Sequence, residues 1–150
     1  MRRALDLLPQ RLAVCRLPPG APIPPWALSG SFCSVTRAPG ELSLICAEDD
    51  LPARPAQGGA AVAGGTGARE EWAADAGLRV ERGFRAFRVE GPLDFGETGV
   101  LAGFLEPLAR AGIPVLALST FDTDYLLVRE GRVMESRRVL GQVAEVRDGS

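Results

Sequence analysis

Hydrophobic and polar residues alternate in short runs along the first part of the chain. Residues 11–17 form one such run, which predicts a strand that ends at Pro18-Pro19-Gly20. Residues 31–36 and 42–47 predict two more strands, rich in β-branched and apolar side chains. The link Ala38-Pro39-Gly40-Glu41 between them suits a tight turn, because proline presets φ and glycine tolerates positive φ. The pattern therefore predicts an antiparallel hairpin.

The remaining segments of this part are less regular. We expect a short helix over residues 3–10, where three leucines need burial. The proline-rich segment 18–28 predicts a loop with at most one helical turn near Trp26, whose side chain we expect to fill the core. Residues 52–69 are mostly Ala, Gly and Pro, so we expect a flexible loop. One or two helical turns are expected within residues 69–76.

The second part carries longer apolar stretches and predicts the order βαββα with a possible closing strand. Strands are expected over residues 83–90, 113–119 and 125–128, helices over 100–111 and 131–141, and the closing strand over 143–146. The stretch 113–119 is so continuously apolar that we expect a central, covered strand. Thr98 or Asp94 is expected to cap the first helix, which Gly112 should end, while Pro107 should kink or loosen its last turn.

Both parts read as a strand, a connection and a hairpin, so the chain predicts an α+β fold of two related units. We place the boundary so that residues 1–82 form a degenerate first unit, including the flexible loop 52–69, and residues 83–150 form the second. Such units have thin cores, and two of them bury more surface than one.

Composition excludes several classes of function. A net charge of -2 and scattered arginines give no footprint for nucleic acid. The chain has no histidine, which removes the commonest general base and imidazole ligation of metals. We see no secretory signal and no apolar run long enough to span a membrane, so we expect a cytoplasmic protein.

The cysteines and one run of acidic residues are candidate reactive or metal-binding groups. Cys15, Cys33 and Cys46 lack CxxC spacing and sit in apolar runs, so we expect buried free thiols, with a disulfide or redox role as the alternative. The acidic run Glu48-Asp49-Asp50 has no further acids at ligand spacing and is expected to be a solvated turn.

The stretch Gly91-Pro92-Leu93-Asp94-Phe95 and the run from Ser119 to Val128 resemble the tandem ACT-domain proteins. The likeness is to the branch of the Castor arginine sensors and of small bacterial proteins with two ACT units. It implies two ferredoxin-like βαββαβ units, each an antiparallel sheet with its helices on one face. It also implies an amino-acid-binding regulatory role, with the ligand held at an interface between units. Castor proteins carry four units, so this chain would need a second copy, and we expect a homodimer.

The resemblance also implies a ligand site built from the turn before the second unit's first helix, the start of the next strand, and the hairpin turn. Its residues would be Asp94, Gly96, Thr98, Gly99, Val100, Leu101, Ile113, Pro114, Val115, Thr120, Phe121, Asp122, Thr123 and Asp124. Backbone amides at a helix N-terminus suit an α-carboxylate. Asp122 or Asp124 could accept a hydrogen bond from an α-ammonium, and Phe121 would supply an apolar wall.

Three functions therefore compete. The leading one is a non-enzymatic regulator with an amino-acid ligand and no cofactor, no catalytic residue and no metal. The second is an interaction or assembly module without a ligand. The third, least favoured because the chain lacks histidine and lysine, is an enzyme that uses Asp94, Asp122 and Asp124 with a divalent metal.

Overall fold

The computed structural model describes residues 3–52, 61–62, 69–72 and 77–150. The chain divides into two compact units, one made of residues 1–10 with 84–150 and the other of residues 11–83. We call them the helical unit and the loop unit. The first ten residues, which the predicted division at residue 82 gives to the first unit, thus fold with the second part of the chain.

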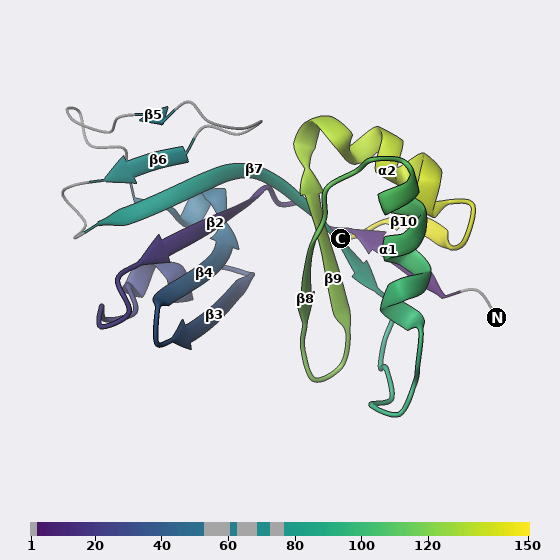
Figure 1. Cartoon of the computed structure of the whole chain (residues 1–150), viewed down its shortest axis with the longest axis horizontal. Coiled ribbons are helices and arrows are strands. Elements are labelled where there is room, and N and C mark those ends of the chain that lie inside the picture. Colours follow the sequence, from purple (N-terminus) through teal and green to yellow (C-terminus); the bar gives the residue numbers. More distant parts are fainter. Residues whose placement is uncertain (1–2, 53–60, 63–68, 73–76) are drawn as a thin grey trace. The chain divides into compact units, whose positions relative to one another are not determined.

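The helical unit is a five-stranded sheet with two α-helices (Figure 1). Its elements are β1 (Ala4–Leu7), the second half of β7 (Leu78–Val89), α1 (Val100–Arg110), β8 (Leu116–Ser119), β9 (Asp124–Arg129), η4 (Glu130–Arg132), α2 (Val133–Leu140) and β10 (Glu145–Asp148). The strand order is β10-β1-β7-β9-β8. Without β1 this is the 4-1-3-2 order of a ferredoxin-like βαββαβ unit, and β1 is an added strand between the first and fourth.

The helix expected over residues 3–10 is wrong, because β1 occupies that place. It pairs parallel to β10 on one side and antiparallel to β7 on the other. All four of its residues are buried. The burial of β1 does not alternate between its two faces, so its two leucines look the same in the sequence as those of a short buried helix.

Both helices cover one face of this sheet. Phe87 and Leu126 lie opposite each other on β7 and β9, and both are fully buried. Helix α1 adds Phe104 and Leu108 to the same core cluster, and α2 packs against α1. The remaining members of the cluster are Leu5, Leu7, Val89, Ile113, Val128, Val133, Val139, Leu140 and Ala144.

Helix α1 begins and ends at glycines. Its N-cap is Gly99, in the left-handed conformation and without a side-chain cap, so the cap expected from Thr98 or Asp94 is wrong. Gly112 follows its last turn with φ of 68°, as expected of a C′ glycine. Pro107 lies inside the helix, where it cannot donate to the carbonyl of Gly103.

The apolar stretch 113–119 is not a central strand. Only its second part, β8, is a strand, and β8 lies at the end of the strand order next to β9. Leu116 is 44% exposed. Ile113 is buried but precedes the strand. The prediction of a central strand was wrong because a run of apolar residues indicates hydrophobicity but does not indicate which strands lie beside it in the sheet.

The loop unit repeats the 4-1-3-2 order with no α-helix among its described residues. Its elements are β2 (Leu12–Leu17), η1 (Pro25–Leu28), β3 (Cys33–Ala38), β4 (Glu41–Ala47), η2 (Glu48–Asp50), β5 (Ala61–Val62), β6 (Arg69–Trp72) and the first half of β7. The strand order is β7-β2-β4-β3, and β6 pairs with β7 and with β5. The predicted hairpin and the turn near Trp26 are confirmed.

Two expectations for this unit need comment. Helical turns within residues 69–76 are wrong for residues 69–72, which form β6, while residues 73–76 lie outside the described part. The flexible loop expected over residues 52–69 also falls mostly outside it. Glu48–Asp50 forms a 3-10 turn with no buried residue. The α+β class with ferredoxin-like strand order is confirmed, and the described residues of the loop unit have 3-10 turns where the βαββαβ pattern predicts α-helices.

The core of the loop unit lies between the sheet and the segment around η1. Its buried members come from the three neighbouring strands and η1: Ala13, Cys15, Leu17, Ala27, Leu42, Leu44, Leu78 and Val80. Trp26 packs against them from η1, half-buried, as expected.

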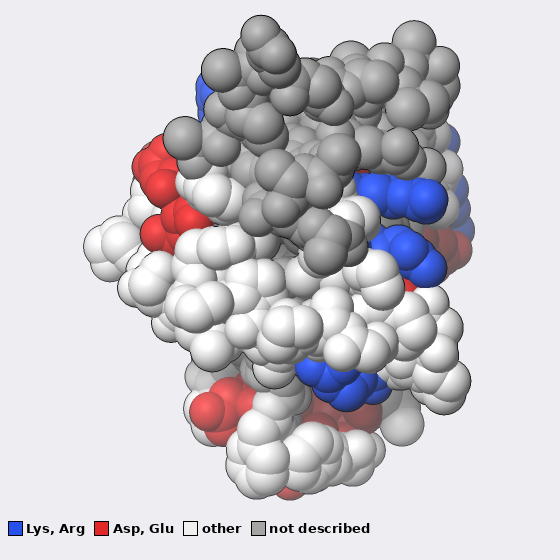
Figure 2. Space-filling view, turned by 90° about the vertical axis from the view of Figure 1, so that its left-hand side faces the viewer, with Lys and Arg blue, Asp and Glu red and all other residues white. Residues whose placement is uncertain are grey.

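Charge is dispersed over the surface that faces the viewer in Figure 2. Acidic and basic side chains form separate small groups among uncharged residues. None of the helices in the described part of the chain is both long and apolar enough to span a bilayer.

Candidate ligand-binding site

Two loops of the helical unit meet beside the start of α1. One is the connection from β7 to α1, and the other is the turn between β8 and β9. The Leu93 amide donates to the Asp122 carbonyl at 2.7 Å, and the Thr123 hydroxyl donates to the Val89 carbonyl. At Gly91 a β-carbon would lie 2.7 Å from the same Asp122 oxygen, so only glycine allows this approach. The loops are therefore joined by hydrogen bonds and by close backbone contact.

The hairpin turn is held by its own side chains. The Thr120 amide donates to the Thr123 carbonyl at 2.8 Å, and the Thr120 hydroxyl donates to the same oxygen at 3.1 Å. Below the turn, the Ser119 hydroxyl donates to Asp124 Oδ1 at 2.6 Å. This engages one oxygen of the Asp124 carboxylate and fixes its orientation.

The loop before α1 is ordered in the same way. Asp94 Oδ1 accepts from the Gly96 amide at 2.7 Å, while the Asp94 amide donates to Glu97 Oε2 at 3.0 Å. Glu97 Oε1 forms an ion pair with Arg3. Asp94 therefore caps its own turn rather than α1, and the Gly96 amide, expected to be open to a ligand, is already engaged.

Between the two loops lies a pocket of about 170 Å³. It is lined by Leu93, Asp94, Phe95, Glu97, Val100, Ser119, Thr120, Phe121, Thr123 and Asp124. The rings of Phe95 and Phe121 meet edge to face, with centroids 5.1 Å apart and an interplanar angle of 87°. Although they contact each other, they are 80% and 78% exposed. One wall of the pocket is therefore an aromatic pair that is mostly open to solvent.

The polar lining is acidic. Asp94, Glu97 and Asp124 line the pocket and no arginine does. The Asp94 and Asp124 hydrogen bonds described above use Oδ1, which leaves Oδ2 of each carboxylate to accept from a bound group. Val100, the first residue of α1, also lines the pocket. The positive end of the helix dipole thus lies beside carboxylates, an arrangement that suits a ligand carrying both charges.

Part of the expected site comes together here and part does not. The expected residues that line the pocket are Asp94, Val100, Thr120, Phe121, Thr123 and Asp124. Those that do not are Gly96, Thr98, Gly99, Leu101, Ile113, Pro114, Val115 and Asp122. Sequence reasoning missed Leu93, Phe95, Glu97 and Ser119. Three of them belong to the stretches on which the resemblance is based, and Glu97 lies two residues after the first of these stretches.

A second pocket, of about 430 Å³, adjoins the first at Thr123. It is lined by Asp6, Arg88, Val89, Glu90, Gly91, Pro92, Asp122 and Thr123. Asp6 is buried and accepts from Arg147 at 2.8 Å and from Arg88 at 3.0 Å. The hydrogen bond from Arg147 is the main reason that the pKa of Asp6 lies below its ordinary value. Asp122 thus belongs to this pocket and not to the one beside α1.

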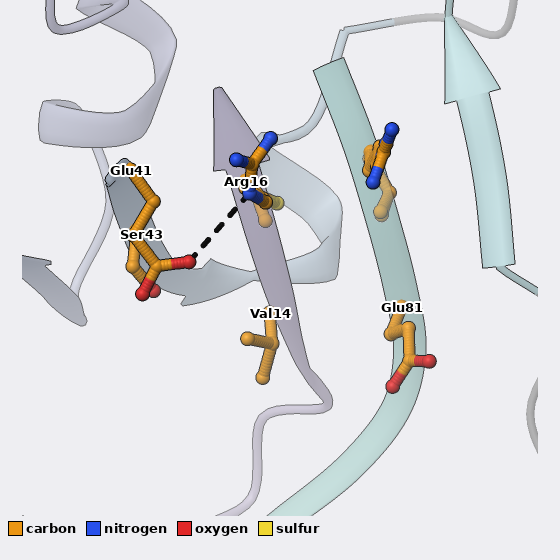
Figure 3. Close-up of a pocket in the computed structure, with 8 residues that line it drawn as sticks. Val14, Arg16, Glu41, Ser43 and Glu81 are labelled. Carbon is orange, nitrogen blue, oxygen red and sulfur yellow. Dashed lines mark ion pairs between the residues drawn. The ribbon is translucent and has the colours of Figure 1, made fainter. Parts of the chain in front are cut away.

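The loop unit carries a third pocket, of about 210 Å³, on its sheet (Figure 3). It is lined by Val14, Cys15, Arg16, Glu41, Ser43, Arg79, Val80 and Glu81. Arg16 and Glu41 point toward each other, with Nε and Oε2 3.7 Å apart. This is a shallow sheet surface of mixed charge, and sequence reasoning did not single it out. Among the residues that the structure describes, no group of three acids or cysteines is arranged to hold a metal ion.

Family models match two segments of the chain. The ACT domain model matches residues 79–140. A second model, described as an N-terminal domain, matches residues 10–54. A search of curated proteins finds no match.

Solved structures resemble the chain over nearly its whole length. Protein Atu0741 from Agobacterium tumefaciens is 30% identical with a TM-score of 0.78, covering 100% of this chain and 96% of that one. VC0802 from Vibrio cholerae, described as a possible transport protein, is 19% identical with a TM-score of 0.62, covering 96% and 91%. The ligand-free regulatory subunit of aspartate kinase from Thermus thermophilus is 13% identical with a TM-score of 0.57, covering 97% of each chain.

The similarity to VC0802 and to the aspartate kinase subunit shows a shared fold, whereas the similarity to Atu0741 shows that the two proteins are of one family. The chain belongs to the same family as Atu0741, and its residues 79–140 match the ACT domain model.

Proposed function

We propose that this protein is a non-enzymatic regulator that binds a free amino acid in the pocket beside α1. The observation that carries the proposal is the joining of two loops around one acidic, aromatic-walled pocket at an uncapped helix N-terminus. The ACT match over residues 79–140 and the fold shared with an aspartate kinase regulatory subunit support a regulatory role.

The chemistry of the pocket suggests how such a ligand would lie. Its ammonium group would donate to Oδ2 of Asp94 and Asp124, in charge-assisted hydrogen bonds. Its carboxylate would face the first turn of α1, where backbone amides and the helix dipole favour an anion. Its side chain would lie against Phe95 and Phe121.

We further propose that a second copy of the chain completes the site. Two large aromatic side chains at 80% and 78% exposure are unusual on a surface with no partner. A ligand that contacts both copies would bind the dimer better than the monomer, and this difference in affinity is what a regulator needs. The proposed homodimer is therefore part of the mechanism.

The test is calorimetric titration of the purified chain with each of the twenty amino acids, with molar mass measured by light scattering. Asp124→Asn keeps the shape of the side chain but removes the charge, and we expect it to weaken binding about tenfold or more. Asp49→Asn, the same change at an exposed position of the loop unit, is the matched control and should bind normally. Equal affinity of both variants would contradict the assigned site.

One observation favours a second candidate, an assembly module without a ligand. Strand β8 lies at the end of the sheet, pairs with β9, and exposes Leu116 at 44%. Exposed strand edges readily accept another strand. The assembly role is favoured if the wild-type protein binds no amino acid and is a dimer, while the Leu116→Glu variant is a monomer.

A further inference from the structure

The three cysteines lie in a row across three neighbouring strands of the loop unit. Cys46 on β4 lies directly opposite Cys33 on β3. On the other side of β4, Cys15 on β2 lies opposite Leu44 and therefore diagonal to Cys46. All three are free thiols. Nothing in the chain spacing of these residues foretells the row, which arises from strand register alone.

Register decides which two of the three sulfurs can be joined. Directly opposed residues of antiparallel strands have Cα atoms about 4.5–5.5 Å apart, within the range of about 4.4–6.8 Å that a disulfide allows. Cys33 and Cys46 meet this condition. Cys15 is opposite Leu44 and is therefore diagonal to Cys46, at about 7–8 Å. A bond between Cys15 and Cys46 would require the backbone to move.

Exposure gives the three thiols different roles. Cys33 is exposed on β3, at the end of the strand order, whereas Cys46 and Cys15 are buried. A reagent from solution therefore meets Cys33 first. The interaction between the two buried thiols raises the pKa of Cys15 and lowers that of Cys46. Because Cys15 lies diagonal to Cys46 across β2 and β4, it can hold the Cys46 side chain in position.

We propose that Cys33 and Cys46 are a site of reversible oxidation, closed to a disulfide by a hydroperoxide, with Cys15 as a positioning residue. In the first step the Cys33 thiolate attacks the peroxide, so that an S–O bond forms, the O–O bond breaks, and the departing oxygen leaves as water or an alcohol. In the second step the Cys46 thiolate attacks the Cys33 sulfur, so that the S–S bond forms and the S–O bond breaks with release of water. The two thiols supply the two electrons that reduce the peroxide.

The first step is slow at neutral pH. Burial, then Cys46 and Asp50, raise the pKa of the Cys33 thiol, so little thiolate is present there to attack. Sustained exposure rather than a brief pulse of peroxide should close the bond. Once closed, it fixes β3, the edge strand of the loop unit, to β4.

The experiment exposes the whole protein to hydrogen peroxide, blocks the remaining thiols with an alkylating agent, and maps tryptic peptides by mass spectrometry. Arg16 and Arg37 separate the three cysteines in sequence, so each falls in its own tryptic peptide. We expect a linked pair of the Cys33 and Cys46 peptides, lost after treatment with a dithiol, and an alkylated Cys15. No disulfide should link two chains, and the oxidised protein should melt at a higher temperature than the reduced protein.

Substitutions of single cysteines test the role of each thiol. Cys33→Ser changes an exposed side chain, so it should fold normally and leave both buried thiols unoxidised by the same dose. Cys15→Ala, which removes the polar group, should still form the Cys33–Cys46 bond, but several times more slowly. A Cys15–Cys46 bond, a Cys33–Cys33 bond between chains, or Cys33 oxidised to the sulfinic acid without a disulfide would each overturn the proposal. An unchanged rate in Cys15→Ala would overturn the role of Cys15.

Discussion

The two units share one strand order, 4-1-3-2, yet cover their sheets with different elements. The helical unit uses α1 and α2, whose large side chains meet Phe87 and Leu126. The loop unit uses the 3-10 turn η1, which contributes Ala27, and its sheet presents small residues to that turn, among them Ala13 and Cys15. Prolines around η1 prevent a longer helix, and small side chains on β2 let an irregular segment pack close to the sheet. The same sheet order can therefore be stabilised by two kinds of cover.

The candidate ligand-binding pocket lies in the unit whose sheet is covered by α-helices. In the helical unit a helix N-terminus opens beside a hairpin turn, and a pocket lies where they meet. In the loop unit the described residues offer no α-helix, and the pocket found there is a sheet surface crossed by the Arg16–Glu41 pair. A helix dipole and a fixed carboxylate are thus available to a ligand in the helical unit.

The largest expected effect comes from Phe87→Ala, which removes a fully buried ring from the helical unit. It should lower the free energy of unfolding by about 3–5 kcal/mol. In urea unfolding, helical circular dichroism reports the helical unit, because both α-helices of the described residues are there, while fluorescence reports the loop unit through Trp26, which packs against its core. The helical signal should shift most. Leu44→Ala, in the other core, should reverse that order, and equal shifts of both signals would mean that the units unfold as one.

Gly91→Ala should come next, at about 1–3 kcal/mol. The added β-carbon would lie 2.7 Å from the Asp122 carbonyl, so the two loops must separate. The helical signal should fall and any bound amino acid should dissociate faster. Gly103→Ala is the control, because a β-carbon there meets nothing within 4 Å. If both variants bind and unfold alike, close contact between the loops is unimportant.

Asp6→Asn should have a smaller, pH-dependent effect of about 1.5 kcal/mol at neutral pH. Hydrogen bonds from Arg147 and Arg88 hold the pKa of Asp6 below its unfolded value. The stability from this group is therefore present above about pH 4 and is lost as the pH falls through the folded pKa. Between pH 6 and 3 the variant should lose less stability than the wild type in the helical signal. Parallel pH profiles would show that the arginines do not stabilise the charged carboxylate.

The smallest effect is expected for Glu106→Gln on α1. Its ion pair with Arg110 spans one helical turn, and both side chains are well exposed, at 63% and 76%. Such pairs contribute about 0.5 kcal/mol or less, and salt screens them. The unfolding midpoint should barely move, and not at all in high salt. A shift as large as that of Asp6→Asn would show that α1 depends on this pair more than its exposure suggests.

Local pattern was sufficient where neighbours in sequence are also neighbours in space. The hairpin of β3 and β4, and the return of β9 after a polar turn, could be predicted because turn residues and flanking strands lie together. The strand β1 could not, because its partners β7 and β10 lie far along the chain. The exposed edge at β8 was missed for the same reason.

The pocket shows the same limit. Asp94, Phe121 and Asp124 were found through a family likeness, and the structure brings them together. Glu97 was missed, since its role depends on the Asp94 amide and on Arg3, which is distant in sequence. Asp122 lines the adjoining pocket instead, because adjacent residues of a tight turn can point to opposite sides.

The position of β1 also bears on the order in which the protein folds as it is synthesised. The loop unit is an insertion between β1 and the rest of the helical unit, so its strands can pair once residue 83 has been made. Strand β1 can pair with β7 once residue 89 has been made, but its other edge must wait for β10, since Asp6 and its partner Arg147 are 141 positions apart. A ribosome-bound chain should thus hold a formed loop unit while β1 is paired on one side only. During that interval, the open edge of β1 is a place where a chaperone or another strand can bind.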